Sequence, residues 1–344
     1  METVEITGRR SVRLIEKPMP RIDANYVLVK VIVVPMCNEY HAYTGGMYLE
    51  RNRPDSLGHE IAGEVMAAPA GASVRPGDRV VALCGFPCGR CVLCRRGYYS
   101  HCAQTEDPRK VCGSDSGECG FAQYAIKPDW LLEPIPDGMS YDHASMACCG
   151  LGPTFGAMER LGVTAGGTVL ITGLGPVGLG GIVNARARGA RVIGVTRSPY
   201  RAELARRLGC ELLAGLSRTD VLAATDGRGA DYVLECSGQP EYQRLAIDAV
   251  ARLGGVAFLA EPGRIDISVD DLVQRGVTLL GTLDINRNDV GRLLQVIGSV
   301  PEQLDLLITH RLPLERIAEA FEAQAAFQSG KILLFPWSST AARG

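Results

Sequence analysis

A glycine-rich stretch near the middle of the chain constrains the fold more than any other feature. An apolar run that ends at Thr172 leads into glycines with the spacing G-x-G-x-x-G, and a helical pattern then continues to Ala187. Gly173 permits a tight turn out of a strand, Gly175 lets the backbone approach a pyrophosphate, and Gly178 lets the helix pack closely on the strand. With a strand before it and a helix after it, the motif predicts a dinucleotide-binding turn.

The helix after the motif provides the expected phosphate site. It begins near Pro176, and its free N–H groups and positive end attract phosphate. Pro176 and Val177 therefore join the three glycines as cofactor-binding candidates.

Strand and helix patterns alternate after the motif, as in a doubly wound parallel sheet. The expected strands are 191–195, 231–235, 255–260 and 277–283, and a helix is expected over 200–208, ended by Gly209. Ser237, just after one of these strands, is a further cofactor-binding candidate.

The segment after the second strand bears on which dinucleotide is bound. A carboxylate there would hold the 2′-OH of NAD and repel the 2′-phosphate of NADP, and this chain has none. Thr196 and Ser198 can donate hydrogen bonds, and Arg197 and Arg201 can pair with a phosphate. The segment favours NADP over NAD; the alternative is that these arginines form a solvated helix start.

Length and charge narrow the class of protein. A chain of 344 residues is expected to form two domains, and 46% hydrophobic with 22% charged residues is an ordinary globular balance. The net charge of −2 gives no reason to expect nucleic-acid or anionic-membrane binding, and no apolar run is long enough to span a membrane. The N-terminus has no secretory signal, so we expect a cytoplasmic protein whose twelve cysteines are metal ligands or buried thiols.

Four cysteines form the clearest metal motif. Cys88, Cys91, Cys94 and Cys102 have the spacing C-x2-C-x2-C-x7-C. Four thiolates in one loop suit a closed tetrahedral zinc site, which is structural rather than catalytic. The alternative, four unrelated cysteines, is disfavoured by the strict three-residue spacing.

Other potential zinc ligands are scattered along the chain. Cys37 follows a strand expected over 27–34, and His59 and Glu60 lie in a Gly-His-Glu motif. A further thiol comes from the pair Cys148 and Cys149. Cys, His and carboxylate are the ligand types of a catalytic zinc, but their spacing alone does not join them.

The two ends of the chain have a different character from its middle. The N-terminal part is punctuated by glycine and proline and includes a strand candidate over 79–84, which suggests a small barrel-like β domain. Amphipathic helices are expected over 290–297 and 314–327, a last strand over 331–335, and a frayed polar tail over 338–344.

Taken together, these motifs resemble the zinc-dependent medium-chain alcohol dehydrogenase family, in its polyol, sorbitol and threonine dehydrogenase-like branch. The matching features occur in the family's order over nearly the whole chain: Cys37, Gly58-His59-Glu60, the Pro-Gly-Asp-Arg-Val run at 76–80, the four-cysteine lobe, Gly120-Phe121-Ala122, the glycine motif and Gly330-Lys331. The resemblance implies an α/β protein with a GroES-like β-rich catalytic domain over 1–152 and 286–344, including a zinc lobe over 84–103. It also implies a Rossmann NAD(P)-binding domain over 153–285.

Carried over residue by residue, the resemblance supplies a catalytic zinc site. Cys37 and His59 match two ligands, Cys149 fits the third better than Cys148, and Glu60 matches the carboxylate that can approach the metal. The implied metal content is one catalytic and one structural zinc ion per chain. The resemblance also implies that the edge strand over 277–283 pairs across a dimer interface, so a homodimer or homotetramer is expected.

One departure from the family concerns the proton relay. The family has Ser or Thr two residues after the first ligand, whereas this chain has Glu39, followed by His41 near the place of the relay histidine. Glu39 could act as a base or reach the metal; alternatively, Glu39 and His41 form a solvated polar pair.

The leading hypothesis is an NAD(P)-dependent oxidoreductase that interconverts an alcohol and its ketone or aldehyde with the help of zinc. A secondary or polyhydroxylated alcohol is favoured as the small-molecule substrate by the polar residues Glu39, Tyr40, His41 and Tyr43. One rival is a zinc-independent NADPH enone or quinone reductase of the same fold, in which Cys37 and Cys149 are ordinary thiols. Another is a non-catalytic nucleotide-binding or redox-sensing protein.

Overall fold

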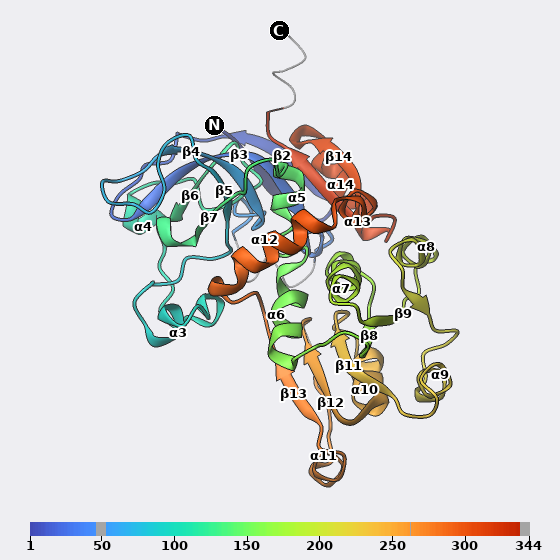
Figure 1. The fold of residues 1–344 in the computed structure, drawn as a ribbon. Coiled ribbons are helices and arrows are strands. Elements are labelled where there is room, and N and C mark those ends of the chain that lie inside the picture. Colours follow the sequence, from blue (N-terminus) through green and yellow to red (C-terminus); the bar gives the residue numbers. More distant parts are fainter. Residues whose placement is uncertain (46–52, 262, 338–344) are drawn as a thin grey trace. The chain divides into compact units, whose positions relative to one another are not determined.

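The computed structural model describes residues 1–45, 53–261 and 263–337, and the tail expected over 338–344 lies outside them. The chain divides into two compact units, drawn in Figure 1 and described separately here. The first unit combines both ends of the chain: Met1–Gly150, Asn286–Gly298 and the segment from Ile308 onward. The second unit comprises Leu151–Ile285 and Ser299–Leu307.

The first unit is built on a seven-stranded sheet with the order β14-β15-β3-β4-β5-β7, in which β6 also pairs with β3; β1 and β2 form a separate hairpin. Its strands are β1 (Glu2–Gly8), β2 (Ser11–Glu16), β3 (Tyr26–Met36), β4 (Ile61–Ala67), β5 (Arg79–Ala82), β6 (Tyr124–Pro128), β7 (Leu132–Pro134), β14 (Ile308–Pro313) and β15 (Lys331–Phe335). Among the described strands of this unit, β14 and β15 pair in parallel and the other pairs are antiparallel.

Strand β3 is central because its valine-rich sequence favours an extended, buried strand. Val29, Val31, Ile61, Phe121 and Leu334 belong to the core around it, and each is fully buried. The helices of this unit are short: α1 (Tyr40–Tyr43), α3 (Val92–Arg95), α4 (Pro108–Cys112), α5 (Tyr141–Ser145), α12 (Val290–Ser299) and α14 (Ile317–Ala325), with 3-10 turns η1 (Tyr99–His101), η2 (Asp129–Leu131), η3 (Arg287–Asp289) and η4 (Leu314–Arg316).

The second unit is a parallel six-stranded sheet with the order β10-β9-β8-β11-β12-β13. Its elements are α6 (Gly152–Leu161), β8 (Thr168–Thr172), α7 (Pro176–Ala187), β9 (Arg191–Val195), α8 (Pro199–Arg207), β10 (Glu211–Leu212), α9 (Arg218–Ala224), β11 (Ala230–Glu235), α10 (Pro240–Ala249), β12 (Val250–Phe258), α11 (Val269–Arg275), β13 (Thr278–Gly281) and α13 (Pro301–Leu307). Helices α6 and α7 pack together on one face, and α9 and α10 on the other (Figure 1). The α/β fold class with a doubly wound sheet is therefore confirmed.

Sequence and structure differ mainly at element boundaries. The helix expected over 314–327 is a 3-10 turn followed by α14, and the strand expected over 277–283 shrinks to β13. The sequence division placed all of 286–344 in the first unit, whereas Ser299–Leu307 lies in the second. The reason is that α13 buries Leu304 and Leu307 while packing against α7 and α8. Among the described residues, no helix is long and apolar enough to cross a membrane.

Candidate metal and cofactor sites

Four potential metal ligands from distant parts of the first unit converge. Cys37 follows the end of β3, His59 and Glu60 precede β4, and Cys149 lies just beyond α5. One ligand atom from each residue lies within 4.8 Å of the others. Long-range strand pairing, rather than local spacing, brings them together, because β3 and β4 are antiparallel neighbours.

The two sulfur atoms of this cluster are in contact. Sγ of Cys37 lies 3.2 Å from Sγ of Cys149, and either thiol can donate a hydrogen bond to the other. The hydrogen bond from Cys149 holds the pKa of Cys37 well below its ordinary value, against burial and aided by the charge of Lys331. The same hydrogen bond and burial raise the pKa of Cys149. The neighbouring Cys148 points elsewhere, and its thiol donates to the carbonyl oxygen of Ala82 at 3.2 Å.

Glu39 lies behind this cluster as a buried support. Its Oε1 is 2.7 Å from Nδ1 of His59, and its Oε2 accepts the backbone N–H of Cys37 at 2.8 Å. Burial alone would raise the pKa of Glu39, but the charge and hydrogen bond of His59 lower it. The carboxylate therefore fixes the ring of His59 with Nε2 left for a metal, as second ligand layers commonly do. The solvated Glu39–His41 pair considered from the sequence is not present, because Glu39 is fully buried.

Glu60 is held by two contacts of its own. Its Oε1 forms an ion pair with Lys331, and its Oε2 accepts the backbone N–H of Gly150 at 3.1 Å. Both side chains of the ion pair are fully buried, and Lys331 also donates to the carbonyl oxygen of Met36 at 3.2 Å. Burial raises the pKa of Glu60 to about 7, although the charge of Lys331 opposes this shift.

Two polar residues singled out beside Cys37 do not join the cluster. His41 is exposed on α1, and its ring packs on Tyr40 with 4.1 Å between ring centroids. Tyr43 is buried against Phe321, and its hydroxyl donates to Glu322 at 2.9 Å. Tyr43 therefore does not supply the polar substrate wall expected from the sequence.

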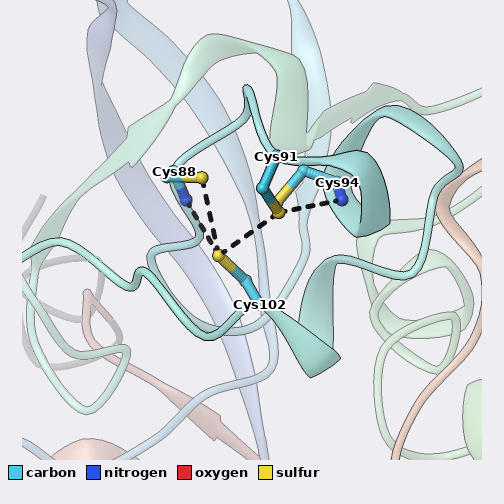
Figure 2. Close-up of side chains that lie close together, drawn as sticks. All are labelled: Cys88, Cys91, Cys94 and Cys102. Carbon is cyan, nitrogen blue, oxygen red and sulfur yellow. Dashed lines mark hydrogen bonds between the residues drawn. The ribbon is translucent and has the colours of Figure 1, made fainter.

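The four-cysteine lobe forms a second, separate cluster around α3 (Figure 2). The Sγ atoms of Cys91 and Cys94 are 3.4 Å apart, those of Cys91 and Cys102 are 3.9 Å apart, and those of Cys88 and Cys102 are 3.6 Å apart. Four Zn–S bonds in a tetrahedron require sulfur separations of about 3.8 Å. These distances and the all-thiol donor set fit a closed zinc site.

The four-cysteine lobe also binds the segment from Asn286 to η3, where the chain returns to the first unit. The backbone N–H of Arg287 in η3 donates to the carbonyl oxygen of Gly97 at 2.9 Å. The Arg287 guanidinium donates to the carbonyl oxygen of Trp130 at 2.9 Å and pairs with Glu133 at 2.7 Å. Asn286 donates to the carbonyl oxygen of Arg96 at 3.0 Å.

The glycine turn of the second unit has the geometry that its sequence predicts. Gly173 has φ +86°, and a Cβ there would lie 2.5 Å from Cβ of Ser237. A Cβ on Gly178 would lie 2.1 Å from the carbonyl oxygen of Gly173. At Gly175, by contrast, the nearest atom to an added Cβ, among the described residues beyond its own segment, is Nη1 of Arg201, at 3.9 Å. Neighbouring atoms therefore leave no room for a side chain at Gly173 and Gly178, whereas space remains beside Gly175, where a pyrophosphate would lie at the start of α7.

The residues after β9 divide into two groups. Thr196 accepts the N–H of Ser198 at 3.2 Å, and Ser198 caps α8 by accepting the N–H of Arg201 at 3.3 Å. Arg201 is buried beside the glycine turn. Arg197 is exposed instead, and its Nη1 lies 3.3 Å from Oε1 of Glu241.

Ser237 lies against the base of the glycine turn and is bound by Glu235. The hydroxyl and backbone N–H of Ser237 both donate to Oε1 of Glu235, the latter at 2.8 Å. Glu235 is fully buried at the end of β11, and burial raises the pKa of its carboxyl. Ser237 therefore shapes the turn in this structure.

Sequence reasoning missed the role of Lys331. It entered only as part of a family motif, yet its ammonium group orients Glu60 inside the metal-ligand cluster. The available signal was a lysine as the first residue of the otherwise apolar strand β15 (Lys331–Phe335), since a buried lysine needs a buried partner.

Known dehydrogenases resemble this chain over nearly its whole length. Residues 23–137 match the family model "Alcohol dehydrogenase GroES-like domain", and residues 176–299 match "Zinc-binding dehydrogenase". L-threonine 3-dehydrogenase of Bacillus licheniformis is 32% identical over 334 residues, covering 93% of this chain and 94% of that protein. Sorbitol dehydrogenase of Bacillus subtilis is 29% identical, covering 98% and 97%. The solved alcohol dehydrogenase of Thermus sp. ATN1 superposes with a TM-score of 0.87 at 26% identity, covering 97% and 99%.

Proposed function

Since this chain belongs to the zinc-dependent medium-chain alcohol dehydrogenase family, we propose that it is an NAD(P)-dependent dehydrogenase of a secondary or polyhydroxylated alcohol, with a catalytic zinc on Cys37, His59 and Cys149. The observation that carries the proposal is the convergence of these three ligands with Glu60. Two thiolates and one imidazole leave a fourth position open, as a catalytic rather than a structural zinc site requires.

Zinc, the nicotinamide cofactor and the protein side chains would have different roles in the reaction. A zinc ion at this cluster would supply Lewis acidity toward the substrate oxygen, and a bound NAD(P) would accept the hydride from the alcohol carbon. Cys37 and Cys149 bring negative charge that favours a divalent cation. Glu39 holds His59 in the tautomer whose Nε2 is available as a ligand.

Glu60 and Lys331 form a second support under the cluster. Because Lys331 and the N–H of Gly150 hold the two oxygens of Glu60, this carboxylate is a neighbour of the metal site rather than a free base. Both oxygens of Glu39 are likewise held, by His59 and by the N–H of Cys37, so neither carboxylate takes the substrate proton directly. His41, the exposed residue of α1, remains the candidate that passes the proton to solvent.

The substrate class rests on the relatives rather than on pocket walls. Relatives that cover most of this chain are named for threonine and for sorbitol, which are both small hydroxylated molecules. NADP is the proposed cofactor, because no carboxylate follows β9 and two arginines lie there. The structural zinc of the proposal lies in the four-cysteine lobe.

The edge of the second unit supports self-association. Strand β13 is the last strand of its sheet, and α11 beside it has no buried residue. Val269, Val273 and Leu253 are exposed there by 70%, 71% and 86%. Pairing of β13 with its copy in a second chain would cover this edge, giving a homodimer or a homotetramer built from such dimers. A reducing cytoplasm suits the thiols, none of which is in a disulfide.

The proposal is tested by a substrate panel with purified protein. Wild type is assayed with NADP and with NAD against L-threonine, polyols, simple secondary alcohols and, in the reductive direction, enones. Alcohol turnover that is lost in Cys149→Ala and retained in Cys148→Ala is the expected result. Enone reduction without alcohol turnover, or full turnover in Cys149→Ala, would overturn it.

A further inference from the structure

One ion pair in the second unit joins the cofactor-binding candidate Arg197 to Glu241, which has no role in the site as described so far. Arg197 Nη1 lies 3.3 Å from Oε1 of Glu241, and the Arg197 guanidinium lies 5.7 Å from the ring centroid of Tyr242. Both partners are exposed, by 69% for the side chain of Arg197 and 44% for that of Glu241. The pair is therefore accessible to a ligand.

The topology places this pair above the glycine turn. Arg197 follows β9 and Glu241 lies in the first turn of α10, which follows β11. Strands β9 and β11 are the two parallel neighbours of β8, so the carboxyl ends of all three lie at one edge of the sheet. The Arg197–Glu241 pair thus reaches across the end of β8, where Gly173 begins the turn.

A dinucleotide bound at this edge brings its adenosine ribose to the residues after β9. Arg197 is then the exposed cation with which a 2′-phosphate would pair, but Arg197 already forms an ion pair with Glu241. Arg201 differs from Arg197, because it is buried and its Nη1 lies 3.9 Å from the position of an added Cβ on Gly175, at the glycine turn.

We propose that Glu241 is a specificity-determining residue, which competes with the 2′-phosphate of NADP for Arg197 and so limits the preference for NADP over NAD. This inference rests on the proposed cofactor site. It assigns the discrimination to a competition between two anions for one guanidinium, rather than to the residues after β9 alone.

The size of the effect follows from the exposure of the pair. Exposed ion pairs contribute little to stability, so the 2′-phosphate can displace Glu241 and the competition lowers affinity only moderately. Replacing Glu241 with glutamine should tighten binding of adenosine 2′,5′-bisphosphate by about three- to fivefold at low salt. Binding of adenosine 5′-monophosphate, which lacks the 2′-phosphate, should change less than about 1.5-fold, and the gain should fade at about 0.5 M salt.

The experiment measures dissociation constants of both adenosine nucleotides by calorimetry on the intact protein. The variants are Glu241→Gln, Arg197→Ala and the double variant. Asp248→Asn is the matched control, because Asp248 pairs with Arg244 at 2.9 Å further along α10. The ratio of the two dissociation constants is the readout, and it requires neither zinc nor turnover.

The expected result is a ratio that shifts toward the bisphosphate in Glu241→Gln, not in the control, and not when Arg197 is already alanine. An unchanged ratio in Glu241→Gln, or an equal gain with and without Arg197, would overturn the inference while leaving the cofactor site intact. Failure of wild type to bind either nucleotide would instead refute the cofactor site itself, and the inference with it.

Discussion

Replacing Glu39 with glutamine separates the two roles that the sequence left open for this residue. Two groups contact the carboxylate: Nδ1 of His59 lies 2.7 Å from Oε1 as an ion pair, and the N–H of Cys37 donates to Oε2. Glutamine is uncharged and has one acceptor oxygen, so its amide nitrogen would face one of these two groups. One of the two buried contacts is therefore lost and His59 is no longer held in one orientation.

The magnitude can be worked from those contacts. A buried hydrogen bond to a charged group is worth about 1.5–3 kcal/mol. Loss of a group that orients a metal ligand typically weakens metal binding about 10- to 100-fold, which is about 1.4–2.7 kcal/mol. The two values agree, so we expect Glu39→Gln to bind zinc at the Cys37 cluster about 10- to 100-fold more weakly.

The assay is competition for zinc against a chromophoric chelator, with turnover measured after zinc is restored. Glu118→Gln is the control, because Glu118 is a largely buried carboxylate paired with Arg109 at 2.6 Å, away from the metal-ligand cluster. Glu118→Gln should keep wild-type zinc affinity. Unchanged zinc affinity in Glu39→Gln, combined with loss of the acidic limb of the pH–rate profile, would refute the positioning role and make Glu39 a base.

Contacts elsewhere in the two units give three further predictions. Gly175→Ala should fold normally and weaken cofactor binding about tenfold or more. Gly178→Ala should instead lower the melting temperature, because its Cβ would lie 2.1 Å from the carbonyl oxygen of Gly173. Calorimetry and nucleotide titration test both variants. Arg287→Ala should lower the free energy of unfolding by about 1–3 kcal/mol and speed hydrogen exchange over 284–290, whereas exposed Arg292→Ala should change it by less than about 0.5 kcal/mol. Burial alone would raise the pKa of Asp55, but Lys17 and Arg109 lower it, so the stability that Asp55 contributes is present above about pH 4 and is lost as the pH falls through its lowered folded pKa. Denaturant titrations at acidic pH should therefore show a smaller loss of unfolding free energy in Asp55→Asn than in wild type. An equal loss in both proteins would contradict the assignment.

The sequence predicted most of the second unit and little of how the first unit assembles its site. The glycine turn and the strand–helix alternation are local patterns, so Gly173, Gly178 and the strands around them could be read directly. The cysteine lobe could be read for the same reason. Element ends were less certain, because the last turn of a helix or strand depends on tertiary packing.

The metal-ligand cluster depends instead on contacts between residues far apart in the chain. Nothing local to Glu39 says that its side chain turns inward to His59, and the hypothesis of a solvated pair with His41 failed for that reason. Lys331 meets Glu60 only because β15 pairs with β3, a register that no single segment encodes. Likewise, the pairing of Arg197 with Glu241 requires β9 and β11 to flank β8.

The central claim is that the chain carries two zinc sites of different character, one closed and one open. Elemental analysis of the purified protein, with Cys149→Ala beside it, tests this directly. We predict two zinc ions per wild-type chain and one in Cys149→Ala, whose four-cysteine lobe is intact. One zinc ion in both proteins would agree with zinc in the four-cysteine lobe and contradict the catalytic zinc site.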